Sequence, residues 1–420
     1  MKKIKVLTIS DHPLSPSGVG TQTRYIIEAL LKTGNFQFNS LAGAMKHNNY
    51  NPTKTEEWGD DWVIYPIDGY GNPDTIRSLM RTYKPDIVWF MTDPRFYIWL
   101  WEMEDEVRAM APLVYYHVWD NYPYPTYNRY YYESCDVIAT ISKVTDDIVK
   151  TVAPETESVY IPHAVNSEVF KPIDDEIIKK ARLDAGVKEG QTLFFWNNRN
   201  ARRKQSGSLI FWFKKFLDTI DKDSAMLLMH TNPKDEAGQD LDAIVHNLGL
   251  TGGEIKFSTS KIAPEQLSLM YNMADCTVNI ADAEGFGLSS LESLSCGTPV
   301  INTLTGGLQE QVTDGENWFG IGIEPASKAI IGSQQIPWIY EDRVSEKDVV
   351  AAMTEIHNMG AEKRRALGLA GREHTLKNYN FDNFNKKWID LMTTTHEKYG
   401  SWENRKLYKR WELIDMEDSR

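Results

Sequence analysis

Short apolar runs rich in β-branched residues alternate with helical stretches along this chain, and the alternation starts twice. In each half, the runs that read as strands are separated by segments of ten or more residues, many with apolar residues at helical spacing. Such spacing implies parallel βαβ units. Residues 168–192 are polar and loop-like, and the pattern restarts after them. The sequence therefore predicts an α/β protein with two doubly wound, Rossmann-like halves, 1–170 and 171–394.

Charge and cysteine content narrow the class of protein. The net charge is −13, so the chain offers no broad basic face of the kind that usually binds a phosphate backbone. The three cysteines, Cys135, Cys276 and Cys296, have no metal-like spacing and fit a reducing cytosol. The opening MKKIKVLTIS reads as a buried strand rather than a signal peptide, and no apolar run approaches the ~18 residues of a membrane span. We expect a soluble, cytoplasmic protein without a transmembrane segment.

The first strand is followed by a glycine-containing loop, SDHPLSPSGVGTQ. Gly18 and Gly20 lack side chains where a backbone could approach a phosphate, and a helix predicted to begin near Thr21 would offer free amides. The signal lacks the third glycine of the dinucleotide fingerprint. Phosphate binding and a merely structural turn both remain open for these two glycines.

A basic cluster, WNNRNARRKQSG, follows the first predicted strand of the second half. Arginine binds phosphate oxygens in bidentate fashion and lysine supplies a point charge. Basic residues after a strand are often only solvated. Here, however, they stand at the carboxyl end of a strand, where doubly wound sheets bind ligands, so we interpret Arg199 and Lys204 as part of a diphosphate site.

Two glutamates flank a glycine turn and a helix start in EGFGLSSLE. The segment Ser289–Glu292 has the pattern of a capping box, which is a structural explanation for Glu292. It does not explain Glu284, which lies on the loop between a predicted strand and the turn. A carboxylate there can accept hydrogen bonds from sugar hydroxyls and stabilise a developing positive charge.

These residues carry a resemblance to a known family. The stretch EGFGLSSLESLSCGTPVI resembles the E-x7-E signature of retaining glycosyltransferases of family 4, which have the GT-B fold of two Rossmann-like domains facing across a cleft. The resemblance covers residues 4–320 and is strongest over 255–317. Other segments agree in order and spacing: the Arg199…Lys204 pair, YIPHAVNSEVFKP, APEQLSLMYNMADC and TGGLQEQVTDGENW. Gln205 stands where that family usually has a glycine.

The resemblance implies a role for each matching residue in binding a nucleoside-diphosphate sugar. Arg199 and Lys204 would bind the diphosphate, with Gly18 and Gly20 on the same phosphates from the other domain. Glu284 would contact the donor sugar and Glu292 the ribose hydroxyls. The implied remaining roles are backbone amides from Phe286, Gly287 and Leu288 near sugar and phosphate, residues 257–262 along the base, and His117 near the anomeric carbon, although a buried core histidine is the commoner case.

The implied activity is retaining transfer of a hexosyl or pentosyl group from a nucleotide sugar, most simply a UDP-sugar, to a hydroxyl acceptor, with no metal or other cofactor. The acceptor would be a glycan, a glycolipid precursor or a small molecule. One alternative keeps the chemistry but places it on a modified base in DNA, using the aromatic residues 112–133 and the basic residues 401–410; the acidic net charge does not favour nucleic acid. Another is an inactive nucleotide-sugar-binding protein. We also expect a C-terminal helix over about 395–420 that packs back on the N-terminal domain.

Overall fold

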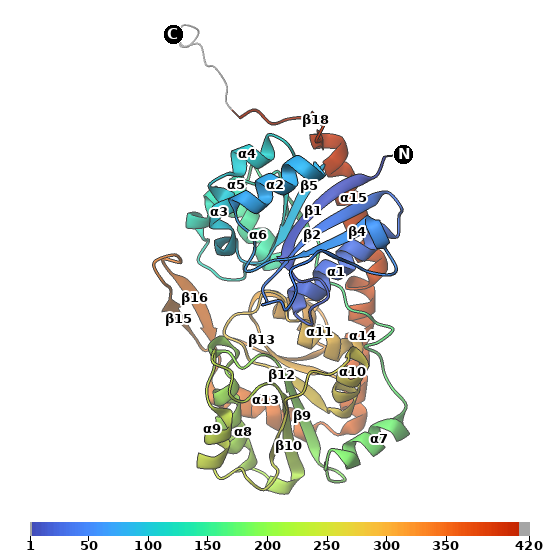
Figure 1. Cartoon of the computed structure of the whole chain (residues 1–420). Coiled ribbons are helices and arrows are strands. Elements are labelled where there is room, and N and C mark those ends of the chain that lie inside the picture. The colour runs from blue at the N-terminus through green and yellow to red at the C-terminus, as the bar shows by residue number, and fades with distance from the viewer. Residues whose placement is uncertain (1, 411–420) are drawn as a thin grey trace.

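Two separate sheets divide the protein into two α/β domains, one above the other in Figure 1. The computed structural model describes residues 2–410. The N-terminal sheet has the strand order β3-β4-β2-β1-β5-β6-β7-β8, and all of its neighbours are parallel except β3 and β4. Its strands are β1 (Ile4–Asp11), β2 (Phe36–Gly43), β3 (Thr53–Lys54), β4 (Trp62–Pro66), β5 (Ile87–Met91), β6 (Leu113–His117), β7 (Val137–Thr140) and β8 (Glu157–Tyr160).

Helices cover this sheet because its strands are apolar on both faces. The strand β5, IVWFM, is buried along its whole length, as expected for a parallel strand between two helical layers. The helices of this half are α1 (Gly18–Leu31), α2 (Pro73–Tyr83), α3 (Ile98–Trp101), α4 (Glu104–Arg108), α5 (Arg129–Glu133) and α6 (Lys143–Val152).

The C-terminal sheet is entirely parallel, with the order β11-β10-β9-β12-β13-β14. Its strands are β9 (Thr192–Asn197), β10 (Ala225–His230), β11 (Ile255–Ser258), β12 (Cys276–Asn279), β13 (Val300–Thr303) and β14 (Gly320–Ile323). Its helices are α7 (Asp175–Asp184), α8 (Ser206–Leu217), α9 (Leu241–Asn247), α10 (Pro264–Met273), α11 (Leu288–Ser295), α12 (Gln309–Val312), α13 (Glu346–Asn358) and α14 (Ala361–Asn378).

Among the parallel strands of each sheet the order reverses once, between β1 and β5 in the N-terminal domain and between β9 and β12 in the C-terminal domain. A ligand of a doubly wound sheet binds at this reversal, outside the carboxyl ends of the strands. Because the two domains turn these ends toward each other, both reversals open on the same space between them (Figure 1).

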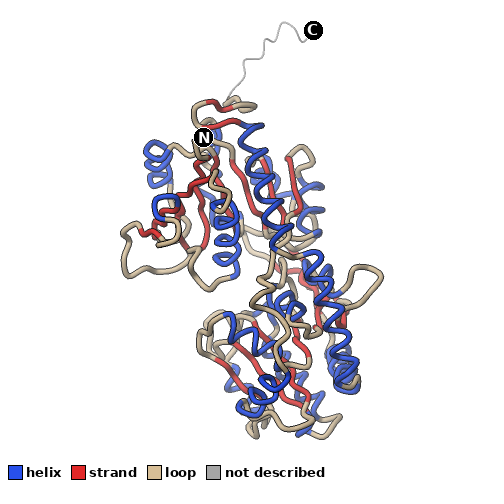
Figure 2. The backbone as a smooth tube through the Cα atoms, turned by 90° about the vertical axis from the view of Figure 1, so that its right-hand side faces the viewer, coloured by secondary structure: helices blue, strands red, loops and turns tan. Residues whose placement is uncertain are grey.

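The last long helix, α15 (Phe381–Tyr399), returns to the N-terminal domain (Figure 2). Its Trp388 is fully buried and packs edge-on against Trp89 of β5 and Tyr116 of β6, with ring centroids 6.0 and 4.8 Å apart. The helix expected over about 395–420 is therefore placed earlier. It ends at Tyr399, because Gly400 has φ +83° and begins the hairpin of β17 (Gly400–Ser401) and β18 (Asn404–Arg405). Residues 411–420 of the expected helix lie outside the described residues.

A second hairpin, β15 (Ser327–Ile331) and β16 (Ile339–Arg343), extends from the C-terminal domain toward the N-terminal one (Figure 1). Sequence patterns did not predict it. Across the gap, the backbone N–H of Tyr340 donates to the carbonyl of Tyr122 at 2.6 Å, and the Tyr127 hydroxyl donates to the carbonyl of Trp338 at 2.9 Å. The hairpin thus forms a direct contact between the two domains.

Candidate functional site

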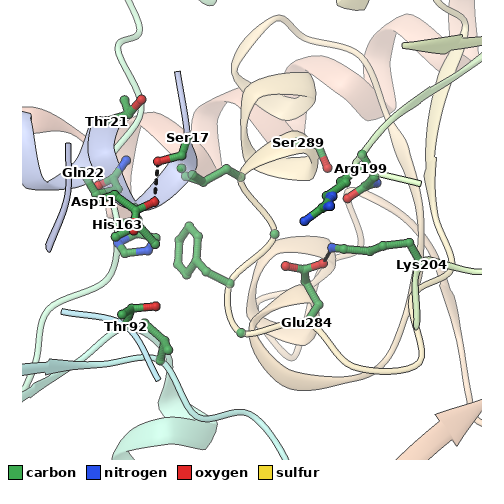
Figure 3. Close-up of a pocket in the computed structure, with 18 of the residues that line it drawn as sticks. Asp11, Ser17, Thr21, Gln22, Thr92, His163, Arg199, Lys204, Glu284 and Ser289 are labelled. Carbon is green, nitrogen blue, oxygen red and sulfur yellow. Dashed lines mark hydrogen bonds and ion pairs between the residues drawn. The ribbon is translucent and has the colours of Figure 1, made fainter. Parts of the chain in front are cut away.

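A cleft of about 1330 Å³ lies between the domains and is lined by residues from both reversals of strand order. Figure 3 shows Asp11, Ser17 and Thr92 of the N-terminal domain on one side, and Arg199, Lys204 and Glu284 of the C-terminal domain on the other. Of the residues predicted from the sequence, those that line the cleft are Gly18, Arg199, Lys204, Glu284, Phe286, Gly287, Leu288 and Glu292, together with Lys261 and Ile262 of the stretch 257–262.

Lys204 and Glu284 form an ion pair in the wall of this cleft. Lys204 ends a 3-10 turn (Arg202–Lys204) after β9, and Glu284 follows β12. Because β9 and β12 are neighbours in the sheet, the two side chains come together. Their side chains are only 9% and 12% exposed. Burial, and after it the charge of Arg203, lowers the pKa of Lys204. An anionic group in the cleft would oppose this shift, because a nearby negative charge favours the protonated amine.

Arg199 lies at the mouth of the cleft with a 69% exposed side chain. Its guanidinium donates two hydrogen bonds to the carboxylate of Asp235, which also lines the cleft. The side chain is therefore held at the cleft, and most of its surface remains accessible to a ligand.

The Gly-Phe-Gly turn before α11 is fixed by close packing. Gly287 has φ +91°, and a Cβ atom there would collide with the side chain of Leu308. Phe286 packs edge-on against the ring of His163 across the domain boundary, with centroids 4.9 Å apart. Its carbonyl accepts a hydrogen bond from Gln311 Nε2 at 2.6 Å. The turn thus holds the N-terminus of α11, with its positive dipole end, at the cleft.

Glu292 is not part of a capping box, so this structural explanation from the sequence is wrong. The N-cap of α11 is Gly287, no side chain caps the helix, and Ser289 lies inside its first turn. Instead, the Tyr271 hydroxyl donates to Glu292 Oε2 at 2.8 Å. Burial raises the pKa of Glu292 to about 7, although this hydrogen bond opposes the shift.

The two N-terminal glycines have different surroundings. The helix α1 begins at Gly18 rather than near Thr21, because the Ser17 hydroxyl caps it by accepting from the N–H of Gly20 at 2.9 Å. Gly18 lines the cleft, and a Cβ atom there would lie 3.0 Å from Leu288 Cδ1 of the other domain. Gly20 does not line the cleft, and a Cβ atom there would lie 2.6 Å from the carbonyl oxygen of His12. The structural-turn interpretation therefore accounts for Gly20.

His117 is placed away from the cleft, in contrast to the role implied for it. The side chain is fully buried at the end of β6, and its Nε2 is 2.8 Å from the Tyr132 hydroxyl in the core of the N-terminal domain. Burial lowers its pKa to about 3. A neutral, enclosed imidazole cannot reach a sugar in the cleft, so the core-histidine alternative describes it.

Asp120, Arg203 and His163 are among the cleft residues to which no individual role was assigned from the sequence. Asp120 follows β6, lines the cleft and has a pKa raised by burial, which the charges of Arg203 and Lys204 oppose. Arg203 lies 3.7 Å from Glu284 and donates to the Ala283 carbonyl at 2.6 Å. His163 is buried, with Nδ1 2.8 Å from the Tyr116 hydroxyl. The rule that found Glu284, a charged residue just beyond a strand, would also have found Asp120.

Within residues 2–410, no group of three or more His, Cys, Asp or Glu side chains is arranged to hold a metal ion. The same residues include no helix that is long and apolar enough to cross a membrane.

Comparisons with known proteins agree with this geometry. Residues 186–373 match the model of the family glycosyl transferases group 1. The chain is 25% identical over 241 residues to a D-inositol 3-phosphate glycosyltransferase of Paenarthrobacter aurescens, covering 56% of each protein. It is 26% identical over 242 residues to a mannosylfructose-phosphate synthase of Agrobacterium fabrum, covering 56% of this chain and 50% of that one. The matches thus span about half the length of these curated relatives.

Similarity to solved structures extends over nearly the whole chain. A sucrose-phosphate synthase of Thermosynechococcus elongatus superposes with a TM-score of 0.75 at 17% identity, covering 94% of this chain and all of the other. HepE of Anabaena, solved in complex with UDP-glucose, superposes with a TM-score of 0.69 at 15% identity over 93% of this chain and all of the other. The protein therefore has the GT-B fold, with two doubly wound domains facing across a cleft, and its C-terminal domain matches the group 1 glycosyltransferases.

Proposed function

We propose that the protein is a retaining glycosyltransferase that moves a sugar from a nucleoside-diphosphate sugar to a hydroxyl acceptor. The observation that carries this proposal is the convergence of Arg199, Lys204, Glu284 and Glu292 on one cleft between two sheets whose strand orders reverse there. Arg199 and Lys204 would face a diphosphate bound in this cleft, and the carboxylate of Glu284 contacts Lys204.

The chemistry follows from the charges of this wall. When the bond between the anomeric carbon and the diphosphate lengthens, negative charge develops on the phosphate oxygens and positive charge on the sugar ring. Lys204 and Arg199 would stabilise the first, and Glu284 the second. The acceptor hydroxyl would attack from the face that the diphosphate leaves, and its proton would pass to a diphosphate oxygen. No covalent nucleophile and no metal ion take part in this scheme.

UDP-sugars are the first donors to test, because HepE is solved with UDP-glucose and an Escherichia coli structure with UDP-2-fluoro glucose superposes on this chain at a TM-score of 0.67. Thermal-shift measurements with UDP, GDP and ADP would identify the nucleotide. Stabilisation by none of the three would contradict the proposal.

The catalytic assignment is tested with Lys204→Met and Glu284→Gln. Each variant should lower kcat by about 10²- to 10³-fold, which is the effect of removing one preorganised electrostatic group. Lys179→Met and Glu176→Gln, which remove an exposed ion pair on α7, are matched controls. Circular dichroism of each variant checks that it is folded. Unchanged turnover in both cleft variants would disprove the assignment.

Two finer parts of the proposal have their own measurements. The anomeric configuration of the product, followed by proton NMR from the first turnovers, should be that of the donor if transfer is retaining. Activity should survive exhaustive chelation if no metal is required. An inverted product or a chelator-sensitive, metal-rescued activity would refute the respective part.

A further inference from the structure

Carboxylates line the cleft from both domains, including Asp235, Glu284, Glu292 and Glu341 of the C-terminal one, whereas its cations come from one domain only. Every lysine and arginine in its lining belongs to the C-terminal domain: Arg199, Arg202, Arg203, Lys204 and Lys261. Among the described residues of the N-terminal domain, the cleft is lined by three carboxylates, Asp11, Asp93 and Asp120, and by no lysine or arginine. The half of the cleft that faces the donor-binding wall is therefore acidic.

The carboxylates come from the ends of three neighbouring strands, β1, β5 and β6. Asp11 accepts hydrogen bonds from the Ser17 and Tyr70 hydroxyls at 2.7 and 2.8 Å (Figure 3). Asp93, whose side chain is 35% exposed, accepts from Arg95 Nη1 at 3.1 Å. Because β1, β5 and β6 are adjacent parallel strands, the three carboxylates follow strand ends along one edge of the sheet.

Arg95 does not present its charge to the cleft. Its side chain is only 9% exposed, and the guanidinium stacks over the Trp119 ring at 4.5 Å. Besides Asp93, it donates to Asn128 Oδ1 at 2.9 Å and to the carbonyl of Gln335, in the β15–β16 hairpin, at 3.3 Å. Arg95 thus binds Asp93 without lining the cleft itself, whereas the carboxylate of Asp93 does line it.

Thr92, between β5 and Asp93, has φ +103°, a conformation that is unfavourable for a β-branched residue. The Tyr115 hydroxyl donates to its carbonyl and so helps to hold the strained backbone. Such outliers persist where the surrounding structure fixes them, and they are concentrated at ligand sites. Thr92 lines the cleft, and Figure 3 shows it on the same side as Asp11 and His163.

An apolar surface completes this half of the cleft. Ile331, Ile336 and Ile339 of the hairpin line the cleft together with Trp119. Because the hairpin is bonded to Tyr122 and Tyr127 of the N-terminal domain, these side chains stand beside the acidic edge rather than in open solvent. A sugar ring matches this combination, since its hydroxyl edge can donate to carboxylates while its C–H face packs on apolar side chains.

We infer that the acceptor of the proposed transfer, bound against the N-terminal half of the cleft, is an uncharged polyhydroxylated compound of sugar size, and that this half discriminates against phosphorylated acceptors. The inference rests on the proposed glycosyl transfer, because that reaction requires an acceptor in this position. A phosphate group here would meet Asp11 and Asp93 and would find no cation of the same domain in the lining. The names of several relatives contain phosphorylated compounds, so the acceptor inferred for this chain differs from those compounds.

Matched acceptor pairs test the inference on the intact protein. Glucose with glucose 6-phosphate, fructose with fructose 6-phosphate, and myo-inositol with its 1-phosphate are supplied with the nucleotide sugar whose nucleotide stabilises the protein most. Nucleoside diphosphate released above the hydrolysis background is the signal. Neutral acceptors should react with kcat/KM at least about 10-fold higher than their phosphates, because one like-charge contact at partly buried sites is worth that much.

A phosphorylated compound that reacts as well as its neutral partner would overturn the inference. The inference would also be overturned if only hydroxymethylated duplex DNA raised the release of nucleoside diphosphate, or if no neutral acceptor raised it. Binding of each compound to the protein saturated with nucleoside diphosphate, measured by calorimetry, gives a second readout that does not depend on turnover. Failure of the nucleotide itself to bind is a different result, which contradicts the proposed function rather than the acceptor class.

Asp93→Asn tests the wall directly. It should lower kcat/KM for neutral acceptors by about 10-fold, since a hydrogen bond to a charged group is lost. The ratio of kcat/KM between each neutral acceptor and its phosphorylated partner should fall as well. The Kd for nucleoside diphosphate, which contacts the other domain, should stay within about twofold. Asp184→Asn, at the exposed end of α7, is the matched control. An unchanged acceptor preference in folded Asp93→Asn would overturn the role of this wall.

Discussion

Arg199 donates two hydrogen bonds to Asp235, from Nε to Oδ2 at 2.8 Å and from Nη2 to Oδ1 at 2.9 Å. The guanidinium lowers the pKa of Asp235, so the carboxylate is ionised at neutral pH. Both groups line the cleft, and a diphosphate would compete with Asp235 for the same N–H donors. We therefore expect this pair to set part of the affinity for the proposed nucleotide.

Removing the charge of Asp235 should strengthen nucleotide binding. We expect Asp235→Asn to lower the Kd for the preferred nucleoside diphosphate by about 2- to 5-fold, since an exposed ion pair contributes up to about 1 kcal/mol. Arg199→Ala should raise the Kd by about 10-fold. Isothermal titration calorimetry at two salt concentrations measures both. Weaker binding by Asp235→Asn would mean that this carboxylate positions the arginine instead of competing for it.

The buried pair of Lys204 and Glu284 should couple strongly in stability. Removing either partner leaves the other charge without its nearest partner in a mostly buried place, with Arg203 still near Glu284 and Asp120 near Lys204, so Lys204→Met and Glu284→Gln should each cost about 3 kcal/mol of unfolding free energy. The double variant should cost at least about 1 kcal/mol less than the sum of the two. Urea denaturation of the four proteins gives the coupling energy, and additive effects would contradict the contact.

Nucleotide affinity should fall on acidification through neutral pH. Glu292 has a pKa raised to about 7, so its carboxylate is protonated as the pH falls from 8 to 6 and accepts hydrogen bonds from ribose hydroxyls less well. We expect the Kd for the nucleoside diphosphate to rise by about 5- to 10-fold over this range. Glu292→Gln has no such titration, and the difference between the two profiles isolates this carboxyl. Parallel profiles would exclude Glu292 from ribose binding.

A methyl group at Gly287 should disrupt the turn before α11. Gly287→Ala adds a Cβ atom that collides with Leu308 at a residue with φ +91°, and it should cost more than about 2 kcal/mol of unfolding free energy and abolish nucleotide binding. Gly190 also has positive φ, +74°, but no atom lies near its missing Cβ. Gly190→Ala should therefore cost only about 1 kcal/mol. Equal losses in the two variants, by thermal unfolding, would argue against the collision.

The sequence predicted both sheets because the alternation of apolar runs with helical segments is enough to indicate parallel βαβ units. It also located Arg199, Lys204 and Glu284, because the carboxyl ends of strands are where such sheets bind ligands. It could not locate His117 correctly. His117 is the last residue of β6, and nothing in the chain around it says whether this residue still lies under the covering helices or already in the cleft. In the structure its ring packs against Tyr115 and Tyr132 in the core, and on this segment the residues that line the cleft begin at Val118.

Conformation at single residues was also beyond sequence reasoning. Gln205 adopts φ +56°, the left-handed region, at the place where the resembled family usually has glycine. Its side chain donates to Asp282 Oδ2 and accepts from the Ser208 hydroxyl, both at 2.6 Å, which helps to hold this backbone. The residues Ser289–Glu292 have the types of a capping box, but the sequence does not show where the helix begins. In the structure Gly287 is the N-cap, so Ser289 already lies inside α11.

The return of α15 to the first domain has a consequence for how the protein is made. Trp388 fills a space between Trp89 and Tyr116 that residues 1–170 cannot fill by themselves. During synthesis the N-terminal sheet leaves the ribosome first, yet the part of one face that lies beside α1 stays uncovered until the final helix emerges. The C-terminal domain has all its sheet strands by residue 323 and can be complete earlier. We therefore expect the domain made first to finish folding last, and a fragment that stops at residue 170 to aggregate through that uncovered face.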